Sequence, residues 1–173
     1  MASPLSVLLL GAGGREHALA WKLAQSPRLG RLLAAPGNPG IAAHAQCVPG
    51  LDILDPAAVA ALARANAIDL LIPGPEAPLA AGVADACRAA GIAVLGPSAA
   101  AARLEASKAF MKEIAAEADV PTARWASFET EAAALAHAAT APLPLVVKAD
   151  GLMAGKGVII ATTRAEAEEA IRQ

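Results

Sequence analysis

The sequence predicts an α/β protein in which a doubly wound, parallel-sheet N-terminal domain precedes an incomplete α+β portion. Three observations lead to this prediction. Through residue 97, short apolar runs alternate with Ala-rich segments of helical spacing, as in a parallel sheet covered by helices. Glycine or proline ends each apolar run. From Ser98 the pattern changes to a long helix and then two strands joined by a Gly-rich loop, which indicates a second, unfinished unit.

The apolar runs of the first unit are expected to be buried strands, at Leu5–Leu10, Arg31–Ala35, Ile68–Ile72 and Ile92–Leu95. The connecting helices are expected at Arg15–Gln25, from Pro56 behind the N-cap Asp55, and at Pro78–Ala90. In such a sheet, ligands bind beyond the carboxyl ends of the strands. The loops GAGGREH, PGPEAP and GPS lie there, so they predict the ligand site.

The second unit is expected to begin with one long helix, AAAARLEASKAFMKEIAAEAD. A helix at Glu131–Ala139, a buried strand at Leu143–Lys148 and a strand at Val158–Ala161 follow, and Thr163-x-x-Glu166 is a capping box that starts a last helix. The predicted domains are therefore residues 1–97, a linking helix at residues 98–122, and a subdomain at residues 123–173 that is incomplete at its C-terminus.

Composition excludes several classes of protein. With 56% hydrophobic and 17% charged residues the chain is expected to fold, and a net charge of −2 with four aromatic residues gives no surface for nucleic acid. No apolar run approaches the roughly 20 residues of a membrane span, and the N-terminal run lacks the basic region of a signal peptide. A cytoplasmic protein with two reduced thiols, Cys47 and Cys87, is expected.

The first Gly-rich loop is GAGGRE, residues 11–16. It differs from the dinucleotide fingerprint because Glu16 replaces the third glycine, and the second strand ends without an acidic residue for a ribose. Gly13, Gly14 and Arg15 could still bind a small phosphate at the helix N-terminus. A tight turn without a ligand explains the same residues equally well.

The second Gly-rich loop is DGLMAGKGV, residues 150–158. It is not a P-loop, because its glycines are one residue too close, Gly157 stands where Ser or Thr is required, and a strand follows. Lys148 ends an apolar strand, where a buried lysine would need an anion such as triphosphate; a lysine reaching solvent is the alternative. For Lys108 and Lys112, spacing alone favours a solvated helix face.

Taken in order, GAGGREHALAWKLAQSP, APGNPG, IDLLIPGPEAPL, GPS…AARLEASKAFMKE, VPTA and VVKADGLMAGKGV resemble the phosphoribosylamine–glycine ligase (glycinamide ribonucleotide synthetase) family of the ATP-grasp superfamily. The resemblance covers essentially the whole chain. It implies a Rossmann-like domain that binds substrate, followed by part of an ATP-grasp core. Met153 departs from the small residue, usually Ala, that the family carries in this loop.

The resemblance implies ATP-dependent ligation of glycine to 5-phosphoribosylamine in purine biosynthesis, with small-molecule substrates and Mg²⁺. It implies ATP contacts from Lys108, Lys148, Gly151, Gly155, Lys156 and Gly157. It implies phosphate contacts from Gly13, Gly14, Arg15 and Glu16, and contacts from Glu76 to the ribose hydroxyls or the amine. Ser107 and His17 are expected to have structural roles only.

The family is longer than this chain, and the resemblance places its Mg²⁺ ligands beyond Gln173. The chain is therefore expected to be an N-terminal fragment that is inactive alone. Two alternatives stay open: another ATP-grasp ligase or carboxylase, and a non-catalytic module that binds a phosphoribosyl group.

Overall fold

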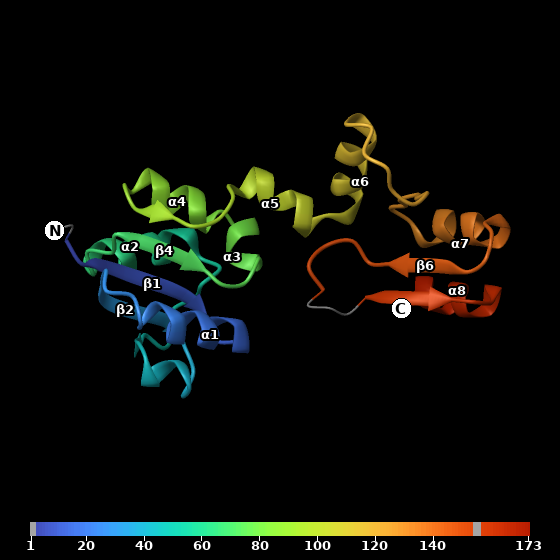
Figure 1. Cartoon of the computed structure of the whole chain (residues 1–173). Coiled ribbons are helices and arrows are strands. Elements are labelled where there is room, and N and C mark those ends of the chain that lie inside the picture. Colours follow the sequence, from blue (N-terminus) through green and yellow to red (C-terminus); the bar gives the residue numbers. More distant parts are fainter. Residues whose placement is uncertain (1–2, 154–156) are drawn as a thin grey trace. The chain divides into compact units, whose positions relative to one another are not determined.

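A computed structural model describes residues 3–153 and 157–173 of the 173-residue chain (Figure 1). The chain divides into two compact units, Met1–Arg103 and Leu104–Gln173, and the division falls inside helix α5 (Ala99–Ala106). The sequence boundary at residues 97–98 lies just before this helix. Each unit has its own sheet and its own core.

The first unit is a five-stranded parallel sheet, so the doubly wound prediction is confirmed. Its strands are β1 (Leu5–Gly11), β2 (Leu29–Pro36), β3 (Gln46–Cys47), β4 (Leu70–Pro73) and β5 (Ala93–Val94). Their order in the sheet is β3-β2-β1-β4-β5, with every neighbouring pair parallel. The short strand β3 was not predicted.

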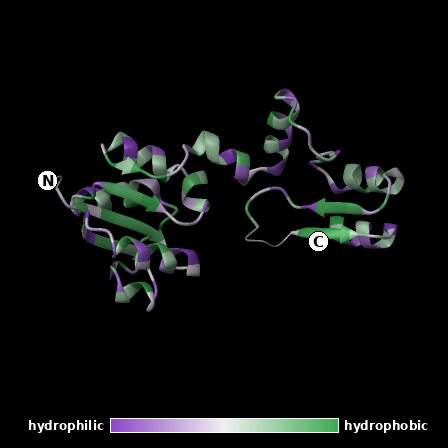
Figure 2. Cartoon of the chain, in the orientation of Figure 1, coloured by the Kyte–Doolittle hydropathy of each residue, from purple (hydrophilic) through white to green (hydrophobic). Residues whose placement is uncertain are grey.

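Alternating side chains of β1 face two separate cores. Leu8 and Leu10 pack with buried residues of α2 (Pro56–Ala65) and α4 (Val83–Ala89), whereas Val7 and Leu9 pack with Ala20 of α1 (Gly14–Leu23). The strands therefore have apolar residues on both faces, as expected when helices cover both sides of a parallel sheet. Figure 2 shows that the strands of the first unit are largely hydrophobic. The N-terminus of α2 is capped as predicted, since Asp55 accepts hydrogen bonds from the amides of Ala57 and Ala58.

The single helix predicted at Pro78–Ala90 is wrong. The structure has α3 (Ala77–Ala80) and α4, separated by Gly82 at a φ of +92°. That conformation is left-handed, and it interrupts a right-handed helix at little cost only for glycine. A 3₁₀ turn, η1 (Ile41–Ala43), completes the first unit.

The second unit contains α6 (Lys108–Glu117), α7 (Glu131–Thr140), the antiparallel hairpin β6–β7 (Leu145–Lys148 and Val158–Ala161) and α8 (Arg164–Arg172). The long helix predicted from residue 99 is wrong, because it breaks at Ser107. This residue has extended backbone angles, and its hydroxyl accepts the Phe110 amide as the N-cap of α6. The capping box of α8 is confirmed.

Strand β6 is not buried on both faces as predicted. Its residues alternate between half-buried and exposed, and Val146 is 52% exposed. The half-buried face lies over a small core of Ala138, Ala161 and Ala167, where Leu145 packs. The segment between α6 and α7 has no regular secondary structure.

Candidate functional site

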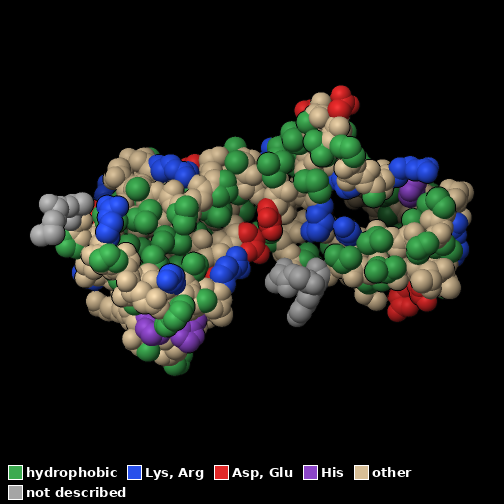
Figure 3. Space-filling view, in the orientation of Figure 1, with side chains coloured by type: hydrophobic (Ala, Val, Ile, Leu, Met, Phe, Trp, Pro, Cys, Tyr) green, Lys and Arg blue, Asp and Glu red, His purple; other side chains and the backbone are tan. Residues whose placement is uncertain are grey.

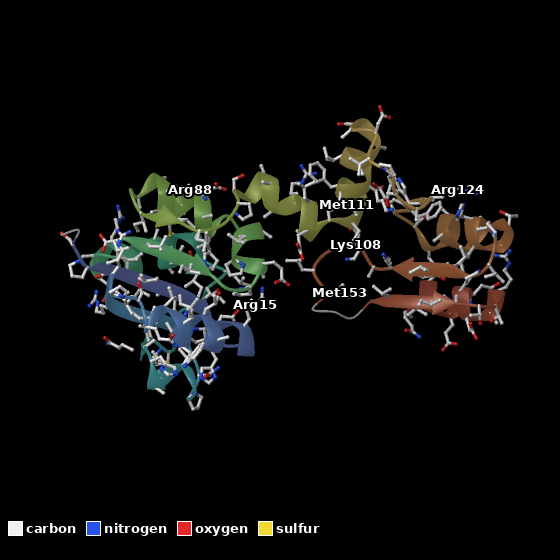
Figure 4. All side chains as sticks on the ribbon, in the orientation of Figure 1. Arg15, Arg88, Lys108, Met111, Arg124 and Met153 are labelled. Atoms are coloured by element: carbon white, nitrogen blue, oxygen red, sulfur yellow. The ribbon has the colours of Figure 1, made fainter. Side chains whose placement is uncertain are left out.

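The first candidate site lies at the carboxyl ends of β1 and β4, which are neighbours in the sheet. Arg15 follows the first loop, and its guanidinium is largely exposed (Figure 4). Its Nε lies 3.3 Å from Glu16 Oε1, and its Nη2 lies 3.8 Å from Glu76 Oε2 in the loop after β4. The structure therefore brings the predicted residues of the two loops together, at the point where the strand order reverses.

A third loop, PGNPG at residues 36–40, joins this edge. Asn38 donates from Nδ2 to the Ala12 carbonyl at 2.7 Å, and its Oδ1 accepts the Ile41 amide at 2.8 Å. The Gly37 amide donates to the Gly11 carbonyl at 3.2 Å. Asn38 was not predicted as a site residue; an asparagine between two Pro-Gly pairs was the available signal.

Glu16 lies beneath the loops and not on their surface. Only 4% of the surface of Glu16 is exposed, and its Oε2 accepts a hydrogen bond from the Gly13 amide at 2.7 Å. A Cβ atom at Gly11, Gly13 or Gly74 would collide with this side chain. The carboxylate thus occupies a space that glycines of two loops leave open.

Gly13, Gly14 and Arg15 surround the N-terminus of α1. The Gly13 amide already donates to Glu16, so the next amides of the first turn are the natural donors for a phosphate. Apart from its chain neighbours and the backbone of its own helix, no atom of the described residues lies within 4 Å of a Cβ built on Gly14. His17 packs against Gly40, and its ring lies 5.8 Å from that of His44. Figure 3 shows histidine side chains gathered on the surface of the first unit.

The second candidate site lies at the N-terminus of α6, within the second unit. The Asp150 carboxylate accepts hydrogen bonds from Ser107 Oγ at 2.9 Å, from the Lys108 amide at 2.6 Å and from the Ala109 amide at 3.3 Å. Lys108 Nζ donates to the Gly151 carbonyl at 2.8 Å. The start of the Gly-rich loop is therefore joined directly to the start of the helix.

These contacts affect the acidity of Asp150. Desolvation acts to raise its pKa, but hydrogen bonds from Ser107 and from the amides of Lys108, Ala109 and Gly151 outweigh it and hold the pKa below its ordinary value. Asp150 and Ser107 were not predicted as site residues. The signal was present in the short sequence ADG after Lys148, because an aspartate before glycine favours local capping.

The lysines of α6 do not form the solvated face that spacing favoured. Both are half-buried, and Lys108 points towards the loop between β6 and β7 (Figure 4). Lys112 Nζ donates to Thr122 Oγ1 and, at 3.1 Å, to the Ala123 carbonyl. Lys112 therefore anchors the VPTA segment.

Lys148 is exposed, so the argument that burial forces it to pair with an anion is wrong. It lies opposite Val158 in the antiparallel hairpin, on the same face as exposed Val146 and Ile160. Its assignment to ATP depends on the resemblance alone.

Gly151 and Gly157 both have left-handed backbone angles, and a Cβ built on Gly157 would lie 3.2 Å from Met153 Cγ. The hairpin pairing continues past the strands, since the Ala149 amide donates to the Gly157 carbonyl at 3.0 Å. The predicted flap residues Gly155 and Lys156 lie outside the described residues.

A cavity of about 250 Å³ lies on the half-buried side of the hairpin, where its lining includes Val147, Ile159 and Ala170. Its described lining carries no charged side chain and includes Gly157, one of the predicted ATP residues.

Across residues 3–153 and 157–173, no three His, Cys, Asp or Glu side chains gather as metal ligands would. No helix in these same stretches has the length and apolar character needed to cross a membrane.

The chain is similar to known proteins over both of its units. The sequence model of the phosphoribosylglycinamide synthetase N domain matches residues 5–105, and that of the synthetase's ATP-grasp (A) domain matches residues 106–173. The phosphoribosylamine–glycine ligases of Agrobacterium fabrum and Vibrio cholerae are 57% and 52% identical, over 96% and 97% of this chain. The chain spans 39% of the length of each.

Solved structures show the same fold. The phosphoribosylamine–glycine ligase of Thermotoga maritima superposes with a TM-score of 0.74 at 28% identity. The superposition covers 95% of this chain and 38% of the Thermotoga chain. A biotin carboxylase domain of Hydrogenobacter thermophilus has a TM-score of 0.75 at 19% identity, covering 98% and 41%, and so shows the fold alone. The N-domain model matches more than half of the residues of this chain, so the chain belongs to the phosphoribosylglycinamide synthetase family.

Proposed function

We propose that the protein containing this chain ligates glycine to 5-phosphoribosylamine with ATP, giving glycinamide ribonucleotide, ADP and phosphate. The observation that carries the proposal is the ordered match of both synthetase domains, together with relatives above 50% identity that are named phosphoribosylamine–glycine ligase. Substrates of this kind are soluble metabolites, and a cytoplasmic location belongs to the same proposal.

The proposed reaction has two steps. The γ-phosphoryl group of ATP moves to a carboxylate oxygen of glycine, forming glycyl phosphate and ADP. The amine nitrogen of phosphoribosylamine then attacks the acyl carbon, the C–O bond to phosphate breaks, and the amine loses a proton. Such chemistry needs positioning and charge neutralisation and no covalent nucleophile, so neither cysteine takes part.

We assign the ATP phosphates to Lys108 and Lys148, with Gly151, Gly155, Lys156 and Gly157 forming the loop that covers them. Lys108 is supported by a contact with that loop, because its ammonium donates a hydrogen bond to the carbonyl of Gly151. A lysine ammonium is a compact charge well suited to a phosphate oxygen. Lys148 lies two residues before Asp150, on the exposed face of β6.

We assign the phosphate of phosphoribosylamine to the amides of Gly14 and Arg15 and to the Arg15 guanidinium, with Gly13 permitting close approach. Glu76 is assigned to the ribose hydroxyls or the amine. Support comes from the position of these groups at the switch point of the parallel sheet and from the open space beside Gly14.

Magnesium enters the proposal as the ion that accompanies ATP and would neutralise charge on its phosphates. Since the described residues do not bring three metal ligands together, we assign no Mg²⁺ ligand in this chain and derive no step through the ion.

The two alternatives lead to different expectations. For another ATP-grasp ligase or a carboxylase, the similar structures are near 20% identity, and these carry the fold and not the chemistry. A module that only binds would hold a ribose phosphate without consuming ATP.

The test is an assay of the whole protein that contains this chain. ADP release should require both glycine and phosphoribosylamine, and mass spectrometry should find glycinamide ribonucleotide. ADP release that depends on bicarbonate instead would indicate a carboxylase, and absence of ADP release with retained ribose phosphate binding would indicate a binding module. The same assay on the 173-residue chain tests the expectation that it does not ligate by itself.

A further inference from the structure

We propose that Glu16 is a positioning residue and not a substrate ligand. Its buried carboxylate joins the loop at residues 11–14 to the loop at residues 73–76 and orients Arg15 for the phosphate of a ribose phosphate. The inference rests on the proposed function, since it concerns the site assigned there to the phosphoribosyl group.

The Glu16 side chain offers a ligand almost no surface. The side chain is 5% exposed, and Oε1 has less than 1 Å² of accessible surface and no hydrogen bond within the described residues. Burying a carboxylate is costly unless it is paired. Glu16 meets this cost through the Gly13 amide, the positive end of the α1 dipole and the Arg15 guanidinium.

Three glycines make room for this carboxylate. A Cβ on Gly11 would lie 2.7 Å from Glu16 Cγ, and a Cβ on Gly13 would lie 2.8 Å from Oε2. A Cβ on Gly74, in the other loop, would overlap Oε1 and Cγ. One side chain therefore fills the space between both loops, which explains why glutamate stands where a dinucleotide-binding loop has its third glycine.

Arg15 connects this buried group to the surface. Its guanidinium lies between Glu16, which is buried, and Glu76, which is 40% exposed at its side chain. Because a flexible arginine loses conformational freedom when it binds, a fixed carboxylate that already restrains it lowers the cost of binding phosphate. The opposing effect is repulsion between Glu16 and the phosphate, which the Arg15 charge and the helix dipole reduce.

The experiment titrates ribose 5-phosphate into the ¹⁵N-labelled 173-residue chain and follows the backbone amides by NMR. Wild type should show shifts at Gly13, Gly14 and Arg15. Glu16→Ala should weaken binding about tenfold, the loss expected for a charged hydrogen-bonding group, and Glu16→Gln by less because it keeps the shape and an acceptor oxygen. Gly74→Ala, which displaces the carboxylate from the other loop, should also weaken binding.

Gly74→Ala combined with Glu16→Ala should bind no worse than the weaker single variant, because both changes remove the same contact. Val59, a buried residue of α2 far from these loops in the sequence, provides the control for general destabilisation. Val59→Ala leaves a cavity in the core and should bind ribose 5-phosphate as wild type does. Unchanged or tighter binding by Glu16→Ala would overturn the positioning role, because repulsion would then outweigh orientation. Failure of the wild type to bind ribose 5-phosphate would instead overturn the proposed site, and this inference with it.

Discussion

Asp150 organises two segments of the second unit that lie 43 residues apart in the sequence. Its carboxylate accepts the hydroxyl of Ser107 and two amides at the start of α6, and the next carbonyl accepts the ammonium of Lys108. A negative charge at this place interacts favourably with the helix dipole and replaces hydrogen bonds that the first turn cannot make internally. Asp150 thus fixes both the lysine assigned to ATP and the first residues of the loop.

We expect Asp150→Ala to lower the free energy of unfolding of the second unit by about 1 kcal/mol, the usual cost of losing a helix cap. The amides of Lys108 and Ala109 should exchange their hydrogens faster, because their acceptor is gone. Asp150→Asn is the matched variant, and its free energy of unfolding should fall by less, since it keeps one acceptor oxygen. Urea unfolding and hydrogen exchange measure both effects, and unchanged exchange at Lys108 would contradict the role of Asp150.

The lowered pKa of Asp150 predicts a pH dependence. A carboxyl that binds its proton more weakly when folded stabilises the fold above its unfolded pKa, here the ordinary value of 3.8. That contribution disappears as pH falls through the lower, folded pKa.

The difference in unfolding free energy between wild type and Asp150→Asn should therefore be constant at neutral pH and shrink below pH 3.8. Urea unfolding of both proteins at a series of pH values measures it. Glu166 also has a pKa below its usual range, through hydrogen bonds from the amide and hydroxyl of Thr162 and the amide of Thr163 that outweigh desolvation. Its contribution is common to both proteins and cancels in the difference. A difference that grows towards acid pH would refute the assignment.

At the scale of elements, the main departures from the predicted pattern are two helix breaks. Gly82 separates α3 from α4 by a left-handed turn, and Ser107 separates α5 from α6 as an N-cap. Both breaks lie inside apolar, Ala-rich stretches with good helical spacing. Helical periodicity alone therefore predicted longer helices, because it reports which residues are apolar and not where the chain must turn.

We expect Gly82→Ala to destabilise the first unit by about 1 kcal/mol, because alanine is strained at positive φ. Space is not the cause, since a Cβ at Gly82 would lie 4.0 Å from the nearest neighbour, Ala99. Gly14→Ala is the matched comparison in α1, where the Cβ meets open space without positive φ, and it should be neutral or stabilise by up to about 0.5 kcal/mol. Denaturant unfolding should show that Gly82→Ala lowers the free energy of unfolding, whereas Gly14→Ala leaves it unchanged or raises it. Equal losses in the two variants would contradict the role of positive φ at Gly82.

Strand β6 shows a different limit of sequence reasoning. The run LPLVVK is nearly all apolar, and such runs indicate a strand buried on both faces. In the structure only one face of the hairpin packs on the small core, and Val146, Val158 and Ile160 remain exposed on the other. The apolar run was therefore informative about the strand and not about the surroundings of Lys148.

At the scale of the whole chain, the two units differ in how much apolar surface they bury. The first has two clusters of Leu, Ile and Val on the two faces of its sheet, whereas the fully buried cluster of the second consists of Ala138, Ala161 and Ala167. A buried leucine contributes roughly 1.5–3 kcal/mol, and an alanine contributes much less because it has far less apolar surface.

We therefore expect the units of the 173-residue chain to open separately, with amides of β1 exchanging more slowly than amides of β6 and β7 in native-state hydrogen exchange. Leu8→Ala, in the larger core, should speed exchange in β1 and leave the β6–β7 hairpin unchanged. Equal protection of both sheets, or acceleration of both by this variant, would show that the chain unfolds as one cooperative body.

The sequence by itself determined the parallel sheet, the positions of four of its five strands, the capped starts of α2 and α8, and the set of Gly-rich loops that identify the family. These features depend on residues close together in the chain, through periodicity, capping and turn chemistry. Only the tertiary structure decided that Glu16 lies buried next to Gly74 of the second loop, that Asn38 joins a third loop, and that Asp150 caps a helix far from it in sequence. Those roles depend on contacts between distant segments, which local pattern does not encode.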